Sequence, residues 1–81
     1  MKHKDFGKFI RAKREESGMS LRRFARAVGM SPTYLSKIER EDFQPPGEEK
    51  IVKMAELLNI DSDVLLAMAG KHVYVYKLRG G

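Results

Sequence analysis

The sequence has no cysteine among its 81 residues, which excludes disulfide bonds and zinc sites built from thiolates. It also has no apolar run approaching the ~20 residues that are needed to span a bilayer. Its first residues, MKHKDFGKF, are charged and lack the apolar block of a signal peptide. We therefore expect one small cytoplasmic domain, with no membrane partner, near the lower size limit for a stable core without covalent staples.

Groups suited to catalysis are scarce as well. The two histidines, His3 and His72, lie near the two ends of the chain, and neither has a pair of carboxylates beside it. No glycine-rich loop that could cradle a phosphate is present. The composition therefore predicts a protein that is not an enzyme and that needs neither a metal nor another cofactor.

Charge is distributed unevenly along the chain. Residues 1–40 contain eleven Lys or Arg and four acidic residues, a net charge of +7, whereas residues 41–81 contain five and seven, a net charge of −2. A basic half attracts polyanions at long range. The alternative is a basic surface that is merely solvated.

Apolar periodicity and capping residues predict five helices. Apolar residues recur at helical spacing, and serine, aspartate or glycine stands where helices begin or end. Two prolines stop any helix from crossing residues 41–47. The first three expected helices cover residues 6–17 with Gly18 as C-cap, 21–28 with Ser20 as N-cap, and 32–40. The fourth runs from about residue 46 or 47 to 58. The fifth begins after its cap, Asp61, and ends at Gly70, and its apolar residues are Val64, Leu65 and Met68.

Residues 21–40, LRRFARAVGMSPTYLSKIER, have the pattern of a helix-turn-helix. Ala25 is small enough to let a second helix come close, and Gly29 can adopt the positive φ that ends the first helix. Ser31 can cap the next helix, and Pro32 suits its first position. Apolar residues that would pack the two helices fall at Phe24, Val28, Met30, Leu35 and Ile38.

With these features, residues 6–69 resemble the phage-repressor/Cro-like (XRE) helix-turn-helix family. The matching segments are Ile10 and Arg14, Gly18-Met19-Ser20, Phe24-Ala25, Val28 to Ser31, Tyr34 to Arg40, and Pro45. The resemblance implies a compact all-α, five-helix, lambda-repressor-like domain that binds operator DNA as a symmetric dimer. It also implies a structural pair between Arg14 and Glu39. A buried carboxylate such as that of Glu39 needs a partner.

One position departs from the family pattern. Members often have glycine directly after the Ile-Glu-Arg triplet, and this chain has Glu41. A non-glycine residue in the left-handed conformation costs about 1 kcal/mol. We therefore expect the turn after residue 40 to be shaped differently here.

The helix over 32–40 offers the candidate base readers. At 100° per residue, Leu35 and Ile38 define its inward side, and the outward side carries Thr33, Ser36, Lys37 and Arg40. A helix with this face fits the major groove, where lysine can bond guanine O6 and N7 and hydroxyls can bond several base edges. We therefore predict base contacts from Thr33, Ser36 and Lys37, against the alternative that this face is only solvated.

Further residues are candidates for the DNA backbone. Ser31 and Tyr34 flank the outward face and can reach phosphate or sugar. The first helix of this motif crosses the DNA backbone, and its outward side is basic. The predicted backbone contacts are Ser31, Tyr34, Arg22, Arg23, Arg26 and Arg40.

The last residues, 71–81, change period. Val73 and Val75 alternate with Tyr74 and Tyr76, which indicates a short strand. A lone strand leaves backbone groups unpaired, so this tail could pair with its copy in a homodimer; it could also be a loose tail or the start of a further region. We divide the chain into a helix-turn-helix domain, 1–70, and this tail.

The sequence thus predicts a sequence-specific regulator of transcription, most simply a repressor. It would insert the helix over 32–40 into the major groove of a pseudo-palindromic operator as a homodimer. The alternative keeps the fold and changes the partner: an antitoxin, or a regulatory subunit, whose acidic second half and apolar tail bind a protein such as a toxin.

Overall fold

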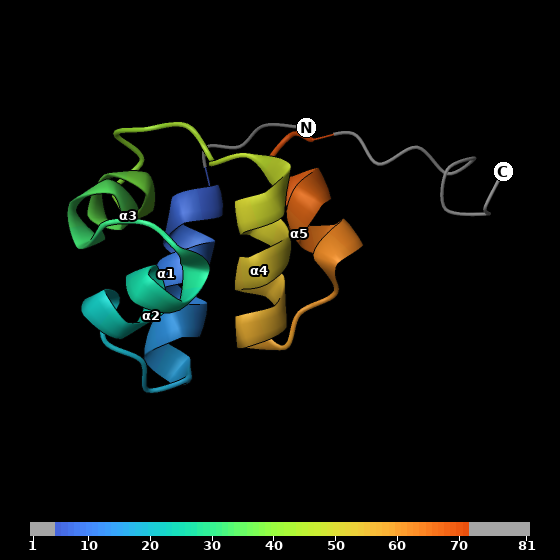
Figure 1. Ribbon diagram of the computed structural model, residues 1–81. Coiled ribbons are helices and arrows are strands. Elements are labelled where there is room, and N and C mark those ends of the chain that lie inside the picture. Colours follow the sequence, from blue (N-terminus) through green and yellow to red (C-terminus); the bar gives the residue numbers. More distant parts are fainter. Residues whose placement is uncertain (1–4, 72–81) are drawn as a thin grey trace, which may run out of the picture.

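The fold is built from five α-helices (Figure 1). The computed structural model describes residues 5–71. Within that range the helices are α1 (Phe6–Glu16), α2 (Leu21–Val28), α3 (Pro32–Glu39), α4 (Glu48–Leu58) and α5 (Ser62–Met68), and there is no strand. The all-α prediction is confirmed, whereas the strand predicted for the tail lies outside the described residues from 72 onward.

Local side-chain chemistry explains where these helices begin and end. The Ser20 and Ser31 hydroxyls accept from the backbone N–H groups of Arg23 and Tyr34, each at 3.1 Å, and so cap α2 and α3. Gly29 ends α2 with φ 95°. At α1 the C-cap is Ser17 rather than the expected Gly18, which follows with φ 74°. Helical ends commonly differ from prediction by one or two residues.

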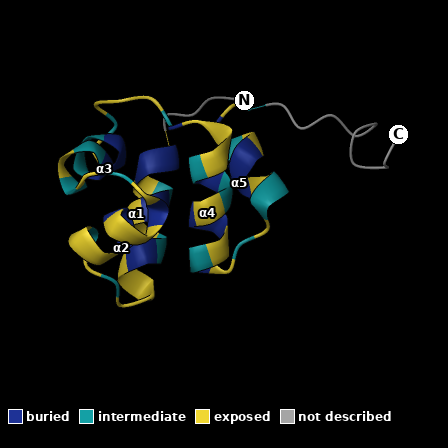
Figure 2. Cartoon of the chain, in the orientation of Figure 1, coloured by how far each residue is buried: buried dark blue, intermediate teal, exposed yellow. Residues whose placement is uncertain are grey.

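The apolar faces of all five helices meet in one core (Figure 2). Helices α4 and α5 pack against each other, and α1 and α2 both pack against α3. In α5 the core takes Leu65 and Leu66, while Val64 is 52% exposed. Val64 and Leu66 lie about 200° apart around the helix axis, so burying Leu66 turns Val64 outward.

A close backbone contact holds α1 against the end of α3. A Cβ atom at Gly7 would overlap the carbonyl oxygen of Ile38, so this position has no room for a side chain. At the same end of α3, Glu39 accepts two hydrogen bonds from Arg14, which lies farther along α1: one from Nε at 2.8 Å and one from Nη2 at 2.9 Å. These contacts fix the position of α3 on the body of the domain.

Candidate nucleic-acid interface

Helices α2 and α3 pack against each other. Ala25 of α2 is fully buried. Its carbonyl oxygen accepts from the N–H of Gly29 at 2.8 Å and from that of Met30 at 2.9 Å, which closes the turn. The structural roles expected for Ala25 and Gly29 are consistent with this geometry.

The Arg14–Glu39 pair has the geometry that the resemblance implied. Both residues are buried, at 8% and 5% exposure. The side-chain hydrogen bonds to Glu39 raise the pKa of the Arg14 guanidinium, against the opposing effect of burial. Arg14 also donates to the Met19 carbonyl at 3.0 Å, so one guanidinium ties together α1, the turn before α2 and α3.

The outward side of α3 carries the predicted base readers. Leu35 and Ile38 are buried, Thr33 and Arg40 are exposed, and Ser36 and Lys37 are half-buried. Ser36 lies in a shallow hollow that Arg11 and Arg40 also line. Sequence reasoning missed Arg11, an exposed cation that α1 brings to this side of α3.

Two predicted backbone-contacting residues, Ser31 and Arg40, lie at the two ends of α3. The Ser31 hydroxyl caps α3 as an acceptor, and its own hydrogen remains available as a donor. Arg40 forms an ion pair with Asp42 at 3.4 Å, and both side chains are more than half exposed. Such exposed pairs are worth about 0–1 kcal/mol, so Arg40 can exchange Asp42 for a phosphate at little cost.

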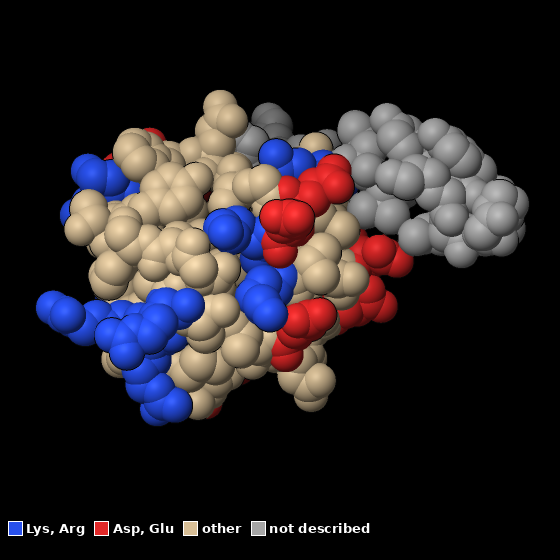
Figure 3. Space-filling model, in the orientation of Figure 1, with Lys and Arg blue, Asp and Glu red and all other residues tan. Residues whose placement is uncertain are grey.

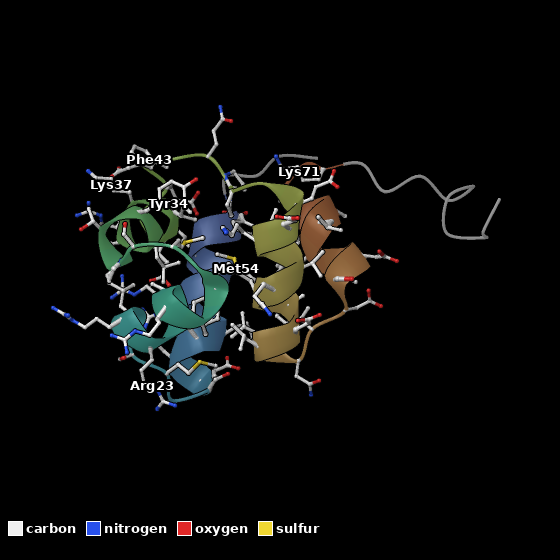
Figure 4. The ribbon with its side chains drawn as sticks, viewed as in Figure 1. Arg23, Tyr34, Lys37, Phe43, Met54 and Lys71 are labelled. Carbon is white, nitrogen blue, oxygen red and sulfur yellow. The ribbon has the colours of Figure 1, made fainter. Side chains whose placement is uncertain are left out.

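The arginines of α2 form an exposed basic group (Figure 3). Arg22 and Arg26 line a hollow together with Pro32, at the start of α3. Arg23 lines a second hollow, toward the turn before α2, together with Arg26, Met19 and Leu57 (Figure 4). Arg26 thus lies between the two hollows, and Arg23 is not among the residues that line the first one. Among the ion pairs of residues 5–71 none involves these three arginines. Arg22 and Arg26 are therefore the two that lie beside α3.

The turn after α3 corrects one expectation. Glu41 adopts φ 68°, the left-handed conformation that glycine usually supplies. Its N–H donates to the Ile38 carbonyl at 3.0 Å and the Asp42 N–H donates to the Lys37 carbonyl at 2.8 Å, which is the Schellman pattern. The prediction of a differently shaped turn was wrong.

The Glu41 side chain explains why this position tolerates glutamate. Its Oε2 accepts from the backbone N–H of Lys8 at 3.0 Å, in the first turn of α1. The N-cap residue of that helix, Asp5, makes no side-chain capping bond. A carboxylate at the positive end of a helix dipole is favourable, and this contact offsets the cost of the backbone conformation.

An aromatic group lies beside Lys37. The Phe43 ring centroid is 5.5 Å from Lys37 Nζ and 5.7 Å from the Tyr34 ring centroid, and Figure 4 shows the three side chains together above α3. Sequence reasoning missed Phe43, because a single apolar residue in a proline-containing loop belongs to no helical stripe. Its exposure, 46%, is the feature that distinguishes it from core residues.

The described residues contain no group of three or more His, Cys, Asp or Glu side chains that could hold a metal ion. Over the same part of the chain, no helix has the length and apolar character required to cross a membrane.

Comparison with known proteins agrees with this geometry. The helix-turn-helix family profile matches residues 10–65. An uncharacterized HTH-type transcriptional regulator of Mycobacterium tuberculosis, found in two strains, is 36% identical over 64 residues, which are 79% of this chain and 45% of that protein. The chain therefore spans less than half the length of these relatives.

A phage protein is similar over more of its own length. The ImmF control region 10 kDa protein of Bacillus phage phi105 is 39% identical over 62 residues, covering 76% of this chain and 68% of that protein. No solved structure is significantly similar. Proteins of the matched family bind DNA and are not enzymes. The profile match and the phage relative show that this chain belongs to the helix-turn-helix family.

Proposed function

We propose that this protein is a transcriptional regulator that binds double-stranded DNA through the outward face of α3. The observation that carries the proposal is the side-chain arrangement on that helix: buried Leu35 and Ile38 turn Thr33, Ser36 and Lys37 away from the core. In helix-turn-helix proteins the second helix lies in the major groove. The names of the relatives, an HTH-type transcriptional regulator and a phage control-region protein, support the same function.

The proposal also assigns individual residues to the bases and to the DNA backbone. Lys37 reads a guanine, and Thr33 and Ser36 contact neighbouring base edges. Ser31, Tyr34, Arg22, Arg23, Arg26 and Arg40 contact phosphate or sugar. The protein acts as a repressor in the cytoplasm of a bacterium or of a phage-infected cell, where its operator is.

We further propose that the protein binds as a homodimer on two half-sites about 10 base pairs apart. Residues 1–70 then form the DNA-binding domain, and residues 71–81 pair with their copy as a two-stranded ribbon. The support is the alternation of Val73 and Val75 with Tyr74 and Tyr76 in the sequence. A native mass that is dimeric for the full chain and monomeric after deletion of residues 72–81 supports the ribbon; an unchanged mass contradicts it.

Selection of bound DNA from a random library tests the central proposal. The wild-type protein is expected to enrich a pseudo-palindromic sequence that contains guanine, and Lys37→Ala is expected to lose the preference at one base pair of each half-site. A bidentate base contact is worth about 1–3 kcal/mol of discrimination. Enrichment of no sequence, or an identical consensus from Lys37→Ala, contradicts the proposed binding face.

The antitoxin hypothesis changes the partner and keeps the fold. It requires a basic partner for the acidic residues on α4 and in the segment that begins α5, which appear red in Figure 3. Stoichiometric co-purification with the product of a neighbouring gene, together with no selected DNA sequence, would favour this second function.

A further inference from the structure

Phe43 is an exposed aromatic residue that the backbone nevertheless holds in place. It lies in the loop between α3 and α4, and its side chain is 46% exposed. Its N–H donates to the Lys37 carbonyl at 3.2 Å, and the Asp42 N–H donates to the same oxygen at 2.8 Å. The left-handed Glu41 produces this reversal, so the loop folds back on the last turn of α3.

The folded-back loop places the Phe43 ring beside two residues of the proposed DNA-binding face. Its centroid is 5.7 Å from the Tyr34 ring, with the two planes inclined by 53°. Lys37 Nζ lies 5.5 Å from the Phe43 centroid, within the range of a cation–π interaction. Tyr34 and Lys37 are neighbours on the helix surface because they are three positions apart, and the ring contacts both of them (Figure 4).

This contact limits where the Lys37 ammonium can be. A lysine side chain is flexible, and fixing it costs conformational entropy when it binds. Among the ion pairs of residues 5–71 none involves Lys37, so no carboxylate there competes with the ring. The aromatic face therefore holds the ammonium on one flank of α3 before DNA arrives.

We propose that Phe43 is a positioning residue that fixes the Lys37 ammonium and so determines which base pair Lys37 reads. This inference rests on the proposed function and assigns Phe43 a part in its specificity. Phe43 itself touches no base in this proposal. Its effect is therefore confined to the base pair that Lys37 reads, whereas a contact of Phe43 with the sugar–phosphate backbone would affect all DNA sequences alike.

The first measurement needs no DNA. In the full chain, the ring current of Phe43 is expected to shift the ε-methylene proton signals of Lys37 upfield in NMR spectra. Phe43→Leu keeps an apolar side chain and removes the ring, so these signals should return to ordinary lysine values. Phe43→Tyr keeps the ring and should preserve the shift. Signals that are the same in wild type and Phe43→Leu overturn the proposal.

The second measurement compares affinities for the selected operator and for operators changed at one base pair. Phe43→Leu is expected to lower discrimination at the Lys37 base pair about two- to fivefold, with other pairs and the salt dependence as in wild type. Phe43→Tyr keeps the ring and should retain the wild-type discrimination. Val64→Ala, which alters the other exposed large apolar residue among those described, is the matched control and should change nothing.

A double-mutant cycle separates positioning from a general role in folding. In a Lys37→Met background, Phe43→Leu should have no further effect at that base pair, because the group that it positions is gone. An equal loss in both backgrounds, or a uniform loss across all operators, overturns the proposal. A wild-type protein that selects no sequence overturns the proposed function as well, whereas a selected sequence that Phe43→Leu leaves unchanged overturns this inference alone.

Discussion

Two charged residues, Arg14 and Glu39, are buried in a domain that is otherwise held together by apolar contacts. Each would be costly alone, because an unpaired buried charge loses its hydration without compensation. Their two hydrogen bonds, with the third from Arg14 to the Met19 carbonyl, satisfy the guanidinium and the carboxylate together. In residues 5–71 no buried side-chain nitrogen or oxygen lacks a hydrogen-bond partner.

Removal of one partner should therefore destabilise the domain far more than removal of both. Arg14→Met is expected to lower the free energy of unfolding by about 3–5 kcal/mol, measured by urea denaturation. The double variant Arg14→Met, Glu39→Met should be more stable than the single one. Arg11→Met, which breaks the exposed pair of Arg11 with Glu15, is the control and should cost less than about 1 kcal/mol. A double variant less stable than Arg14→Met contradicts this account.

Glu41 combines an unfavourable backbone with a favourable side chain. Glu41→Ala keeps the left-handed strain and removes the capping bond to Lys8, so it should cost about 1 kcal/mol of stability. Glu41→Gly loses the same bond but relieves about 1 kcal/mol of backbone strain, so its stability should be near that of wild type. Urea denaturation of the two variants measures the difference. Equal stabilities of Glu41→Ala and Glu41→Gly would show that the backbone conformation carries no strain.

At the scale of the elements, the sequence predicted what local chemistry determines. The N-caps Ser20 and Ser31 and the left-handed Gly29 act on residues within a few positions of themselves. Helix α2 therefore begins and ends where expected, and α3 begins where expected and ends one residue early, at Glu39. The Glu41 capping bond joins residues 33 positions apart, and Phe43 meets Lys37 only because the chain reverses. No local pattern contains these contacts, and sequence reasoning missed both.

The close approach of α1 to α3 is another contact between distant parts of the chain that the sequence did not predict. Gly7 lies inside α1, where helix propensity alone favours alanine over glycine by about 1 kcal/mol. Because a Cβ at this position would overlap the Ile38 carbonyl, Gly7→Ala should instead destabilise the domain by about 1–3 kcal/mol. Thermal unfolding of Gly7→Ala shows whether the variant is more or less stable than wild type. A variant more stable than wild type would mean that α1 and α3 are farther apart than described.

At the scale of the whole molecule, charge is unevenly distributed over the surface. Basic side chains gather over α2 and α3, whereas α4 and the start of α5 carry acidic side chains interleaved with basic ones (Figure 3). The charge count along the sequence predicted the basic side, because α2 and α3 both belong to the basic half of the chain. It did not predict that Arg22 and Arg26, rather than Arg23, lie next to the start of α3.

The salt dependence of DNA binding tests which of the α2 arginines contact phosphates. Each phosphate that a cation neutralises adds about −0.9 to the slope of log K against log salt. If the protein binds as a dimer, Arg22→Ala removes one contact per copy and should make the slope less steep by about 1.8. Arg23→Ala should have a smaller effect, since Arg22 and Arg26 line the hollow beside Pro32 at the start of α3 and Arg23 does not.

Lys53→Ala provides the matched control for this measurement. It removes the same charge from α4, where Lys53 pairs with Glu56 at 3.9 Å. Long-range attraction alone depends on net charge, so it predicts similar changes for Arg22→Ala and Lys53→Ala. Direct phosphate contact predicts a change in slope for Arg22→Ala and none for Lys53→Ala. Equal slopes for the two variants would therefore remove Arg22 from the interface and leave only the general attraction of a basic surface.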